Sequence, residues 1–391
     1  MHGSRDGSLD GAWADAGAGR VTAPSPGVAA VLAGLGLVGA TALGAALLVR
    51  LLHPLLVRYA LARPNARSAH RTPTPQGGGI AVLGALVPAA AAGAAALAAW
   101  GAAWGPAMPE PGSTLALGPG DALRLATVLA AALLVGAVGT VDDIHPLPPL
   151  PRLALQLIAM GLAVSALPEG ARVLPWLPLA AERLLLVVGG AWFVNLTNFM
   201  DGMDWLTVAD AVPATAALAL FWFAGLLSAP AGLVALCLLG AMLGFAPFNR
   251  PVARLFLGDV GSLAVGLLTA YALFDLAGHG GLVAAVLLVL YPIADSGLTL
   301  LWRLRRGDRV WEAHRHHFYQ VATARGCGVR EVLGRVFVTN IALAAFAAAS
   351  LWQGRAALSV LDLALGAAAV ALLLRALARG RAPRGESRPG A

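Results

Sequence analysis

The sequence predicts an all-α membrane protein whose chain crosses the bilayer many times. Of its 391 residues, 59% are hydrophobic and only 12% are charged, and the mean hydropathy is +0.76. A soluble globular domain carries about 25% charged residues, so this composition excludes a soluble enzyme. Because a backbone inside lipid has to satisfy its own hydrogen bonds, the apolar segments are expected to form helices.

Apolar stretches of about 20 residues, the length of a helix that crosses a bilayer, recur along the chain. We predict a bundle of about eleven spans, with ten or twelve as alternatives. The fifth span is short and is expected to be broken or to continue as a loop. The predicted spans cover residues 27–52, 78–104, 122–141, 153–168, 184–197, 208–228, 231–248, 261–276, 281–302, 336–352 and 357–377.

A single integral-membrane domain is expected over residues 26–378. Residues 1–25 are rich in Gly, Ala, Asp and Pro, and residues 379–391 are polar and basic, so both segments are predicted to be disordered tails. The first tail lacks the apolar core and cleavage pattern of a signal peptide. We therefore expect the first span to be a permanent helix.

The arginines predict the orientation of the chain. All 27 basic residues are arginines, and 21 of them fall on one side of the membrane if the N-terminus lies outside. The positive-inside rule makes that side the cytoplasm, with the C-terminus inside. The net charge of +7 is then explained by topology and not by nucleic-acid binding. The polar strings described below all fall on the cytoplasmic side.

Two adjacent carboxylates, Asp142 and Asp143, end the third span, and prolines follow them closely. Neighbouring residues of a helix point about 100° apart, so both can face one ligand only if the helix ends there. Two neighbouring carboxylates repel each other and require a cation or a basic partner. The alternative is a solvated helix cap.

Oxygen-bearing side chains recur in NLTNFMDGMDW, where Asn195, Asn198, Asp201 and Asp204 are spaced by three residues. On a straight helix this row drifts, so only adjacent members can share a site. Asp259 follows in FLGDVGS, at the start of the eighth span. Amide and carboxylate oxygens suit Mg²⁺. Polar helix caps are the alternative interpretation of both strings.

Further polar groups on the same side are candidates for substrate contact. RPNARSAHRTPTPQGGG contributes Arg67 and, at Gly78, a backbone that can approach an anion closely. Arg152, Asn249 and Arg254 lie next to the carboxylate strings. The alternative for the first loop is a basic segment that only obeys the positive-inside rule.

The last cytoplasmic loop ends in HRHHFYQ, which holds His314, Arg315, His316 and His317. A histidine-rich tract can bind zinc, but no cysteine or carboxylate set completes such a site. Arginine and histidine donors fit phosphate oxygens better. Asp295, inside the ninth span, is expected to be functional, or to pair with Arg303 or a helix dipole.

Five strings in order carry a resemblance to a known family: RPNARSAHRTPTPQGGG, VDDIHPLPPLPRLALQ, NLTNFMDGMDW, FNRPVARLFLGDVGS and HRHHFYQ. Over residues 27–377 the chain resembles the polyprenyl-phosphate N-acetylhexosamine-1-phosphate transferases, which include the bacterial phospho-muramoyl-pentapeptide translocase. The PTPQGGG and HRHHFYQ forms are most similar to the branch that starts O-antigen and related surface glycans.

The resemblance implies that a UDP-amino sugar donates its sugar-1-phosphate to undecaprenyl phosphate and that UMP leaves. It implies Mg²⁺, or Mn²⁺ as an alternative, with Asp259 as the main ligand and Asn198 as a second. Direct displacement is favoured over a phospho-aspartate on Asp142 or Asp143, because the attacking phosphate is already an anion. The resemblance further implies that Asp142 and Asp143 act near the lipid phosphate. Asp201 and Asp204 would support the nucleotide or the metal. The phosphates or the sugar would be clamped by His314, Arg315, His316 and His317.

Three residues depart from the family pattern. Ala62 stands where Asp is frequent, Gln76 where Arg is frequent, and Trp205 where Gly is usual. Trp205 is expected to narrow the pocket or to stack on uracil or sugar.

The alternatives in function are a phospho-N-acetylmuramoyl-pentapeptide transferase, a lipid or small-molecule transporter, and an inactive scaffold. A transporter would place its polar groups near the midplane of the membrane. The family precedent includes dimers, which makes a second copy of the chain a candidate partner.

Overall fold

The computed structural model describes residues 27–62, 73–104, 117–309, 314–353 and 356–381, and it confirms an all-α membrane protein. Nine helices within these residues are long and apolar enough to cross a membrane. The predicted N-terminal tail, residues 1–25, lies outside the described residues, as does the part of the predicted C-terminal tail after residue 381; Arg379 is the last residue of α13. The elements are α1 (Val28–Tyr59), β1 (Leu61–Ala62), β2 (Thr74–Pro75), α2 (Gly78–Trp104), α3 (Asp121–Ile144), α4 (Pro149–Ser165), α5 (Leu179–Met200), α6 (Leu206–Phe223), α7 (Ala229–Asn249), α8 (Asp259–Leu276), η3 (Ala277–Gly281), α9 (Leu282–Leu288), α10 (Leu290–Arg305), α11 (Phe318–Ala324), α12 (Val329–Trp352) and α13 (Ala356–Arg379).

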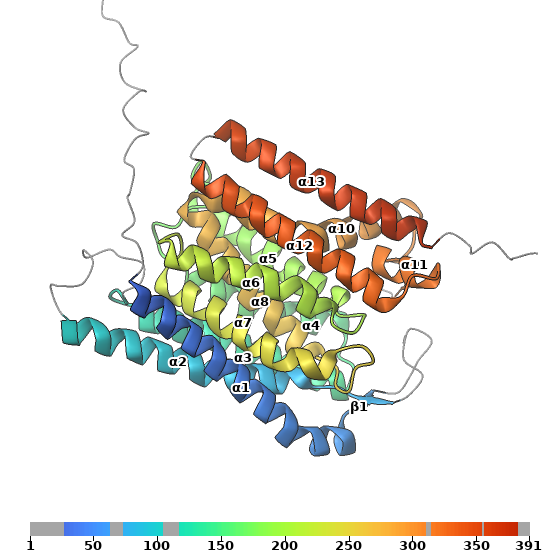
Figure 1. The fold of residues 1–391 in the computed structure, drawn as a ribbon, viewed down its shortest axis with the longest axis horizontal. Helices are drawn as coiled ribbons and strands as arrows, with labels where there is room; N and C mark the ends of the chain where they lie inside the picture. Colours follow the sequence, from blue (N-terminus) through green and yellow to red (C-terminus); the bar gives the residue numbers. More distant parts are fainter. Residues whose placement is uncertain (1–26, 63–72, 105–116, 310–313, 354–355, 382–391) are drawn as a thin grey trace, which may run out of the picture.

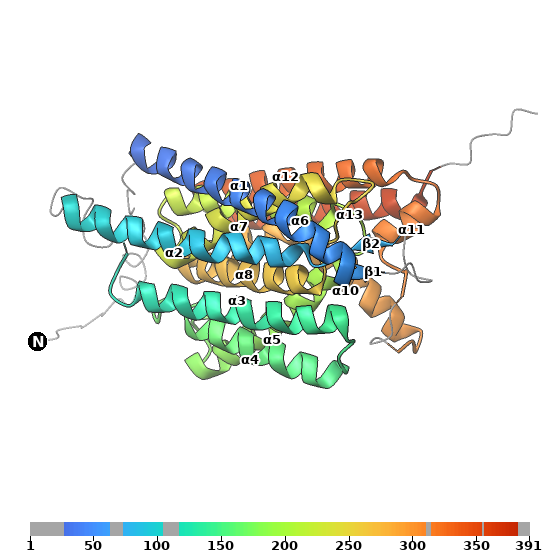
Figure 2. The same cartoon turned by 90° about the horizontal axis from the view of Figure 1, so that it is seen from below.

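Helices α7 and α8 form the centre of the bundle. Figures 1 and 2 show α1 and α2 on one side of them, α12 and α13 on another, and α3, α4 and α5 on a third. Almost every residue of α8 is buried, whereas α1 buries only Gly34, Thr41, Ala45, Val49 and Leu56. These five follow spacings of four and seven, so they form one stripe that packs inward while the rest of α1 faces outward.

A pair of glycines lets α1 approach α7 closely. A side chain at Gly240 would lie 2.6 Å from the carbonyl oxygen of Val38, and one at Gly244 would overlap the carbonyl oxygen of Ala42. The two glycines are four residues apart, the spacing by which small residues bring membrane helices into backbone contact.

Two of the predicted spans differ in length from the helices observed. The fourth is the 17-residue helix α4, and the fifth is the full 22-residue helix α5, which begins at Leu179 instead of near residue 184. The prediction of a short fifth span was wrong, because α5 also includes Glu182 and Arg183. Glu182 is in fact 0% exposed, and it accepts hydrogen bonds from Arg172 Nε at 2.5 Å and the N–H of Val173 at 2.6 Å.

The predicted ninth span is interrupted. Gly280, with φ of 90°, turns the chain between α8 and α9, and Val289 leaves helical geometry between α9 and α10. Pro292 has no N–H to bond the carbonyl four residues earlier, which accounts for a break at this point. The eleven predicted segments all fall on helices, but α4, α9 and α10 are each too short to cross a bilayer alone.

A short pairing closes the loop between α1 and α2. Strands β1 and β2 pair antiparallel, with Leu61 opposite Pro75 and Ala62 opposite Thr74. The N–H of Phe256 donates to the carbonyl of Pro75 at 2.9 Å. The start of α2 is thereby held against the loop that leads into α8.

The ends of α3 and α8 meet at Gly139, where a side chain would overlap the peptide group that joins Asp259 and Val260. We predict that Gly139→Ala destabilises the protein by about 1–3 kcal/mol, because an added methyl group has no room. The measurement is the unfolding temperature of the purified protein in detergent.

The control is Gly189→Ala on α5, where nothing lies within 4 Å of the added carbon. Alanine favours a helix over glycine by about 0.5–1 kcal/mol, so this variant should keep or slightly raise the unfolding temperature. Equal behaviour of the two variants would contradict the close approach of α3 and α8.

Candidate active site

Three helix ends converge where the sequence places its carboxylates. Asp143, near the end of α3, accepts the N–H of Asp259 at 3.0 Å through Oδ1 and the N–H of Val260 at 3.3 Å through Oδ2. The first N–H groups of a helix have no partner within that helix. Asp143 therefore caps α8 from another helix, and both of its oxygens are occupied by backbone donors.

Glycines and one glutamine allow this convergence. Gly258 has φ of 76°, and a side chain there would lie 2.5 Å from Oδ2 of Asp143. Gln76, the residue found in place of a family arginine, donates to the backbone carbonyl of Asp143 at 2.8 Å. Gly78 is buried, and its N–H donates to the carbonyl of Phe256 at 2.9 Å. The expected contact of Gly78 with an anion is thus not available in this structure, because its amide is used in packing.

Arg152 joins the two other carboxylates of the site. Its Nη1 lies 2.7 Å from Oδ2 of Asp142 and 3.7 Å from Oδ2 of Asp259. Oδ1 of Asp142 accepts the N–H of Leu147 at 2.6 Å. The side chains of Arg152 and Asp259 are 25% and 29% exposed, so solvent or a ligand can reach this pair, whereas that of Asp142 is only 8% exposed.

Asn198 orients Asp259. Its Nδ2 donates to Oδ1 of Asp259 at 2.8 Å and to Oγ of Ser262 at 2.9 Å. In this orientation the amide nitrogen, and not its oxygen, faces the carboxylate. Asn198 therefore holds the carboxylate in place. If it also bound a metal ion, the ligand would be its amide oxygen.

The other members of the row each have a different partner; α5 ends at Met200, so the expected row on a straight helix is interrupted before Asp201 and Asp204. Asn195 donates to Oε1 of the buried Gln156 on α4 at 2.6 Å, which places it between helices. Oδ2 of Asp204 accepts the N–H of Ala253 at 2.9 Å. Of the four residues in this row, only Asn198 forms a hydrogen bond with Asp259.

Asp201 follows the last residue of α5 and accepts the hydroxyl of Thr207 at 2.5 Å. The pKa of Asp201 is raised to about 8, mainly by burial and in smaller part by the nearby carboxylates of Asp259, Asp143 and Asp204. This part of the site has more carboxylates than cations. It would be stabilised by a positively charged ligand.

The donor set suits Mg²⁺ but does not form a closed metal cage. In the described part of the chain, no three His, Cys, Asp or Glu side chains are grouped as a metal site. Mg²⁺ is usually held by one or two carboxylates together with substrate phosphates and waters, so a partly exposed Asp259 fits that requirement.

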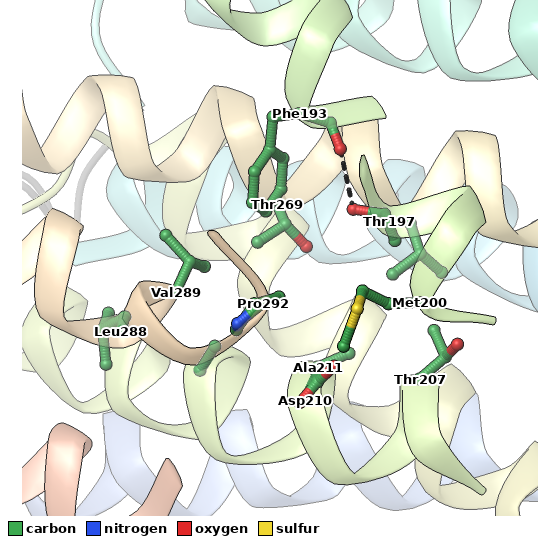
Figure 3. A pocket seen from close by; sticks show the side chains of 12 residues that line it. Phe193, Thr197, Met200, Thr207, Asp210, Ala211, Thr269, Leu288, Val289 and Pro292 are labelled. Atoms are coloured by element: carbon green, nitrogen blue, oxygen red, sulfur yellow. Dashed lines mark hydrogen bonds between the residues drawn. The ribbon is translucent and has the colours of Figure 1, made fainter. Parts of the chain in front are cut away.

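A small cavity lies between α5, α6, α8 and the junction of α9 with α10, and Met200 and Thr207 are among the residues that line it (Figure 3). It has a volume of about 30 Å³ and is lined mainly by apolar side chains, with Thr207, Asp210 and Thr269 among the polar ones. This volume suits water and not a nucleotide sugar. This cavity is therefore not a candidate for the substrate site.

The HRHHFYQ loop forms a row of rings beside the start of α11. The rings of His314 and His317 are stacked with centroids 4.9 Å apart, and those of His317 and Tyr319 follow at 5.6 Å. The pKa of His314 is lowered to about 4, mainly by burial and in smaller part by the nearby His317 and Arg303. His314 is therefore neutral at neutral pH and offers a lone pair as well as an N–H.

The remaining cationic candidates are more exposed. His316, Arg315 and Arg254 are all exposed, which leaves them accessible to an anionic ligand, although the structure does not bring Arg254 into contact with the carboxylates. Arg67 lies outside the described residues.

Trp205 and Asn249 have a packing role that the sequence did not reveal. Trp205 is the only described residue other than glycine with a positive φ, at 65°, which explains why the family usually has glycine there. Asn249 accepts its N–H at 2.7 Å, and its indole N–H donates to the carbonyl of Ala246 at 2.9 Å. The ring packs 6.2 Å from that of Phe337, and its expected contact with uracil or sugar stays a prediction.

Two hydroxyl groups that support the site carboxylates were not predicted from the sequence. Ser262, which accepts from Asn198, stands in the GDVGS string, and Thr207 lies six residues after Asp201. The string itself was the only available signal for Ser262.

Comparisons with known proteins identify the family. Residues 125–277, which include the α3, α5 and α8 carboxylates, match the model of glycosyl transferase family 4. The decaprenyl-phosphate N-acetylglucosaminephosphotransferase of Mycobacterium tuberculosis is 30% identical over 356 residues, covering 82% of this chain and 83% of the relative. The enzyme of that name from Mycolicibacterium smegmatis is 29% identical over 372 residues, with 86% of each chain covered.

A phospho-N-acetylmuramoyl-pentapeptide-transferase of Geobacillus thermodenitrificans is 36% identical over a shorter stretch of 146 residues, which is 35% of this chain and 42% of the relative. The chain therefore belongs to glycosyl transferase family 4, the superfamily of polyprenyl-phosphate N-acetylhexosamine-1-phosphate transferases.

Proposed function

We propose that this protein transfers an N-acetylhexosamine-1-phosphate from a UDP-sugar to undecaprenyl phosphate at the cytoplasmic face of the bacterial inner membrane. The observation that supports this most is Asp259, a partly exposed carboxylate fixed between Asn198 and Arg152 where three helix ends meet. UDP-GlcNAc is the first donor to test, because relatives that match most of the chain are named for that sugar. The product would initiate a lipid-linked glycan such as O-antigen.

In the proposed reaction, an oxygen of the lipid phosphate forms a bond to the β-phosphorus of the donor. The bond between that phosphorus and the bridging oxygen breaks, and UMP leaves with the electron pair. The attacking oxygen already carries the charge, so no general base is needed. The task of the protein is to bring two anions together and to hold them in line.

Asp259 would hold Mg²⁺, with Asn198 as the second candidate. The ion supplies charge neutralisation for the donor diphosphate when it is bound. Arg152 adds a fixed positive charge between Asp142 and Asp259, and the histidines of HRHHFYQ would contact phosphate or sugar.

The hydrogen bonding of Asp142 and Asp143 supports direct displacement. Asp143 uses both oxygens to cap α8, and Asp142 uses both for Leu147 and Arg152. A nucleophilic carboxylate would have to give up these partners before attack. Asp142 and Asp143 therefore act in this scheme as the supports of Asp259 and Arg152.

A phospho-N-acetylmuramoyl-pentapeptide transferase is the second candidate, because a relative of that name is 36% identical over 35% of this chain. The two candidates differ only in the donor. A transporter is disfavoured, because the carboxylates gather at helix ends on one side of the bundle.

Purified protein with undecaprenyl phosphate and Mg²⁺ is expected to release UMP from UDP-GlcNAc and not from UDP-MurNAc-pentapeptide. The measurement is UMP production across a panel that also contains UDP-GalNAc, UDP-FucNAc and UDP-QuiNAc, with decaprenyl phosphate as a second acceptor. Chelation by EDTA should stop release, and excess Mg²⁺ should restore it. Release only from the pentapeptide donor would select the second candidate.

Asp259→Asn should lower UMP release by about 10²–10³-fold, because it removes the negative charge that would hold the cation of the diphosphate. The matched control is Asp121→Asn, since Asp121 is likewise the first residue of a membrane helix and is 8% exposed. The control should keep its turnover. Similar losses in both variants would show a folding defect and contradict the role of Asp259.

The two loops of the site touch at Gly202, where a side chain would overlap the hydroxyl of Tyr319. Gly202→Ala is therefore expected to separate the HRHHFYQ loop from Asp201 and to reduce UMP release.

Adding Tyr319→Phe removes the hydroxyl and leaves Cζ of the ring 3.3 Å from the added carbon, so the double variant should recover activity relative to Gly202→Ala alone. The measurement is kcat/KM for the donor in both single variants and the double variant. Additive losses would contradict a direct contact between the loops.

A further inference from the structure

Asp295 on α10 is a carboxylate enclosed by the protein, with 0% of its surface exposed. Its Oδ1 lies 3.1 Å from Nδ1 of His317 and accepts the N–H of Phe318 at 3.1 Å. Its Oδ2 accepts the N–H of Tyr319 and the hydroxyl of Tyr291, both at 3.4 Å. An enclosed carboxylate is costly unless it is fully hydrogen-bonded, and these contacts meet that requirement.

Three of the four donors belong to one short stretch of chain, residues 317–319, at the end of HRHHFYQ. Asp295 therefore fixes the point where the histidine loop joins α11. Because an ionised carboxylate only accepts hydrogen bonds, His317 must carry its proton on Nδ1. The orientation of its ring is then set, and Nε2 is left for another partner.

The same stretch is tied to the carboxylate side of the site. The hydroxyl of Tyr319 donates to the carbonyl of Phe199 at 3.0 Å, two residues before Asp201, and the ring covers Gly202. His314 stacks on His317. A rigid connection thus runs from Asp295 through His317 and Tyr319 to the turn that holds Asp201.

We infer that Asp295 is a positioning residue for donor recognition: it sets the tautomer of His317 and holds the histidine row at a fixed place beside Asp201. This inference rests on the proposed function, because the donor is what the histidine row would contact. Asp295 does not touch the substrate, and its effect is exerted through His317 and residues 318–319.

Asp275 provides a matched control for an enclosed carboxylate. It is also 0% exposed, and it accepts the N–H of Ser228 at 2.8 Å and the hydroxyl of Ser228 at 2.9 Å. It lies near the opposite end of α8 from Asp259. Asp275→Asn therefore tests how the loss of an enclosed carboxylate affects the protein when the histidine loop is left unchanged.

The experiment compares Asp295→Asn, Asp295→Glu and Asp275→Asn by steady-state kinetics with UDP-GlcNAc and undecaprenyl phosphate. Asp295→Asn should raise KM for the donor by about tenfold, equivalent to one lost interaction of about 1.4 kcal/mol, and leave KM for the lipid unchanged. Asp295→Glu should recover part of the loss. Asp275→Asn should leave both KM values unchanged.

Coupling to His317 is tested by a double-mutant cycle with His317→Gln. The double variant should be no worse than the worse single variant if Asp295 acts through His317. Additive effects, or an Asp295→Asn variant whose unfolding temperature falls while the donor KM stays constant, would overturn the inference and leave a structural role only.

Nitrogen-15 spectra of histidine-labelled protein give a readout that needs no turnover. The signal that disappears in His317→Gln should show protonated Nδ1 in the wild type and lose that state in Asp295→Asn. If the wild type releases no UMP from any donor, the proposed function fails, while this spectrum still decides whether Asp295 sets the tautomer. An Nε2-protonated His317 in the wild type would contradict the inference.

Discussion

The whole site depends on the cap that Asp143 places on the first turn of α8. Through this contact a carboxylate on α3 determines where α8 begins, and so where Asp259 stands. Without it, two backbone N–H groups at the centre of the protein would lack partners, and such groups are costly to leave unsatisfied. The requirement for glycine at positions 139 and 258 follows from this contact, since side chains there would separate the two helices.

The fold could be predicted well from composition and span length, because the hydrophobic requirement of the bilayer acts on every residue of a span. The errors occurred where polar side chains are satisfied inside the protein. Glu182, outside the predicted fifth span, is enclosed and accepts a hydrogen bond from Arg172, so α5 can begin before it. The break at Val289 depends on Pro292 together with tertiary packing, which periodicity cannot show.

The site was predicted at the level of residue types, and less well at the level of roles. The positions of Asp142, Asn198 and Asp259 agree with their strings, since each lies close to a helix end at one side of the bundle. Their partners could not be predicted, because a contact such as Asp143 with Asp259 joins residues more than a hundred positions apart. Trp205 shows the limit most clearly, since only its backbone angle reveals why the family prefers glycine there.

The pairing of Arg152 with two carboxylates has a consequence for selectivity in the cell. The cytoplasm is rich in inorganic phosphate and nucleotides, and an unpaired arginine at a membrane surface would collect them. A guanidinium that lies between Asp142 and Asp259 gains little from a bare anion, because the anion must compete with two carboxylates already in place. A diphosphate that arrives with a divalent cation brings the charge that compensates Asp259. Under the proposed function, this arrangement would favour a diphosphate chelated to a cation over the bare anions of the cytoplasm.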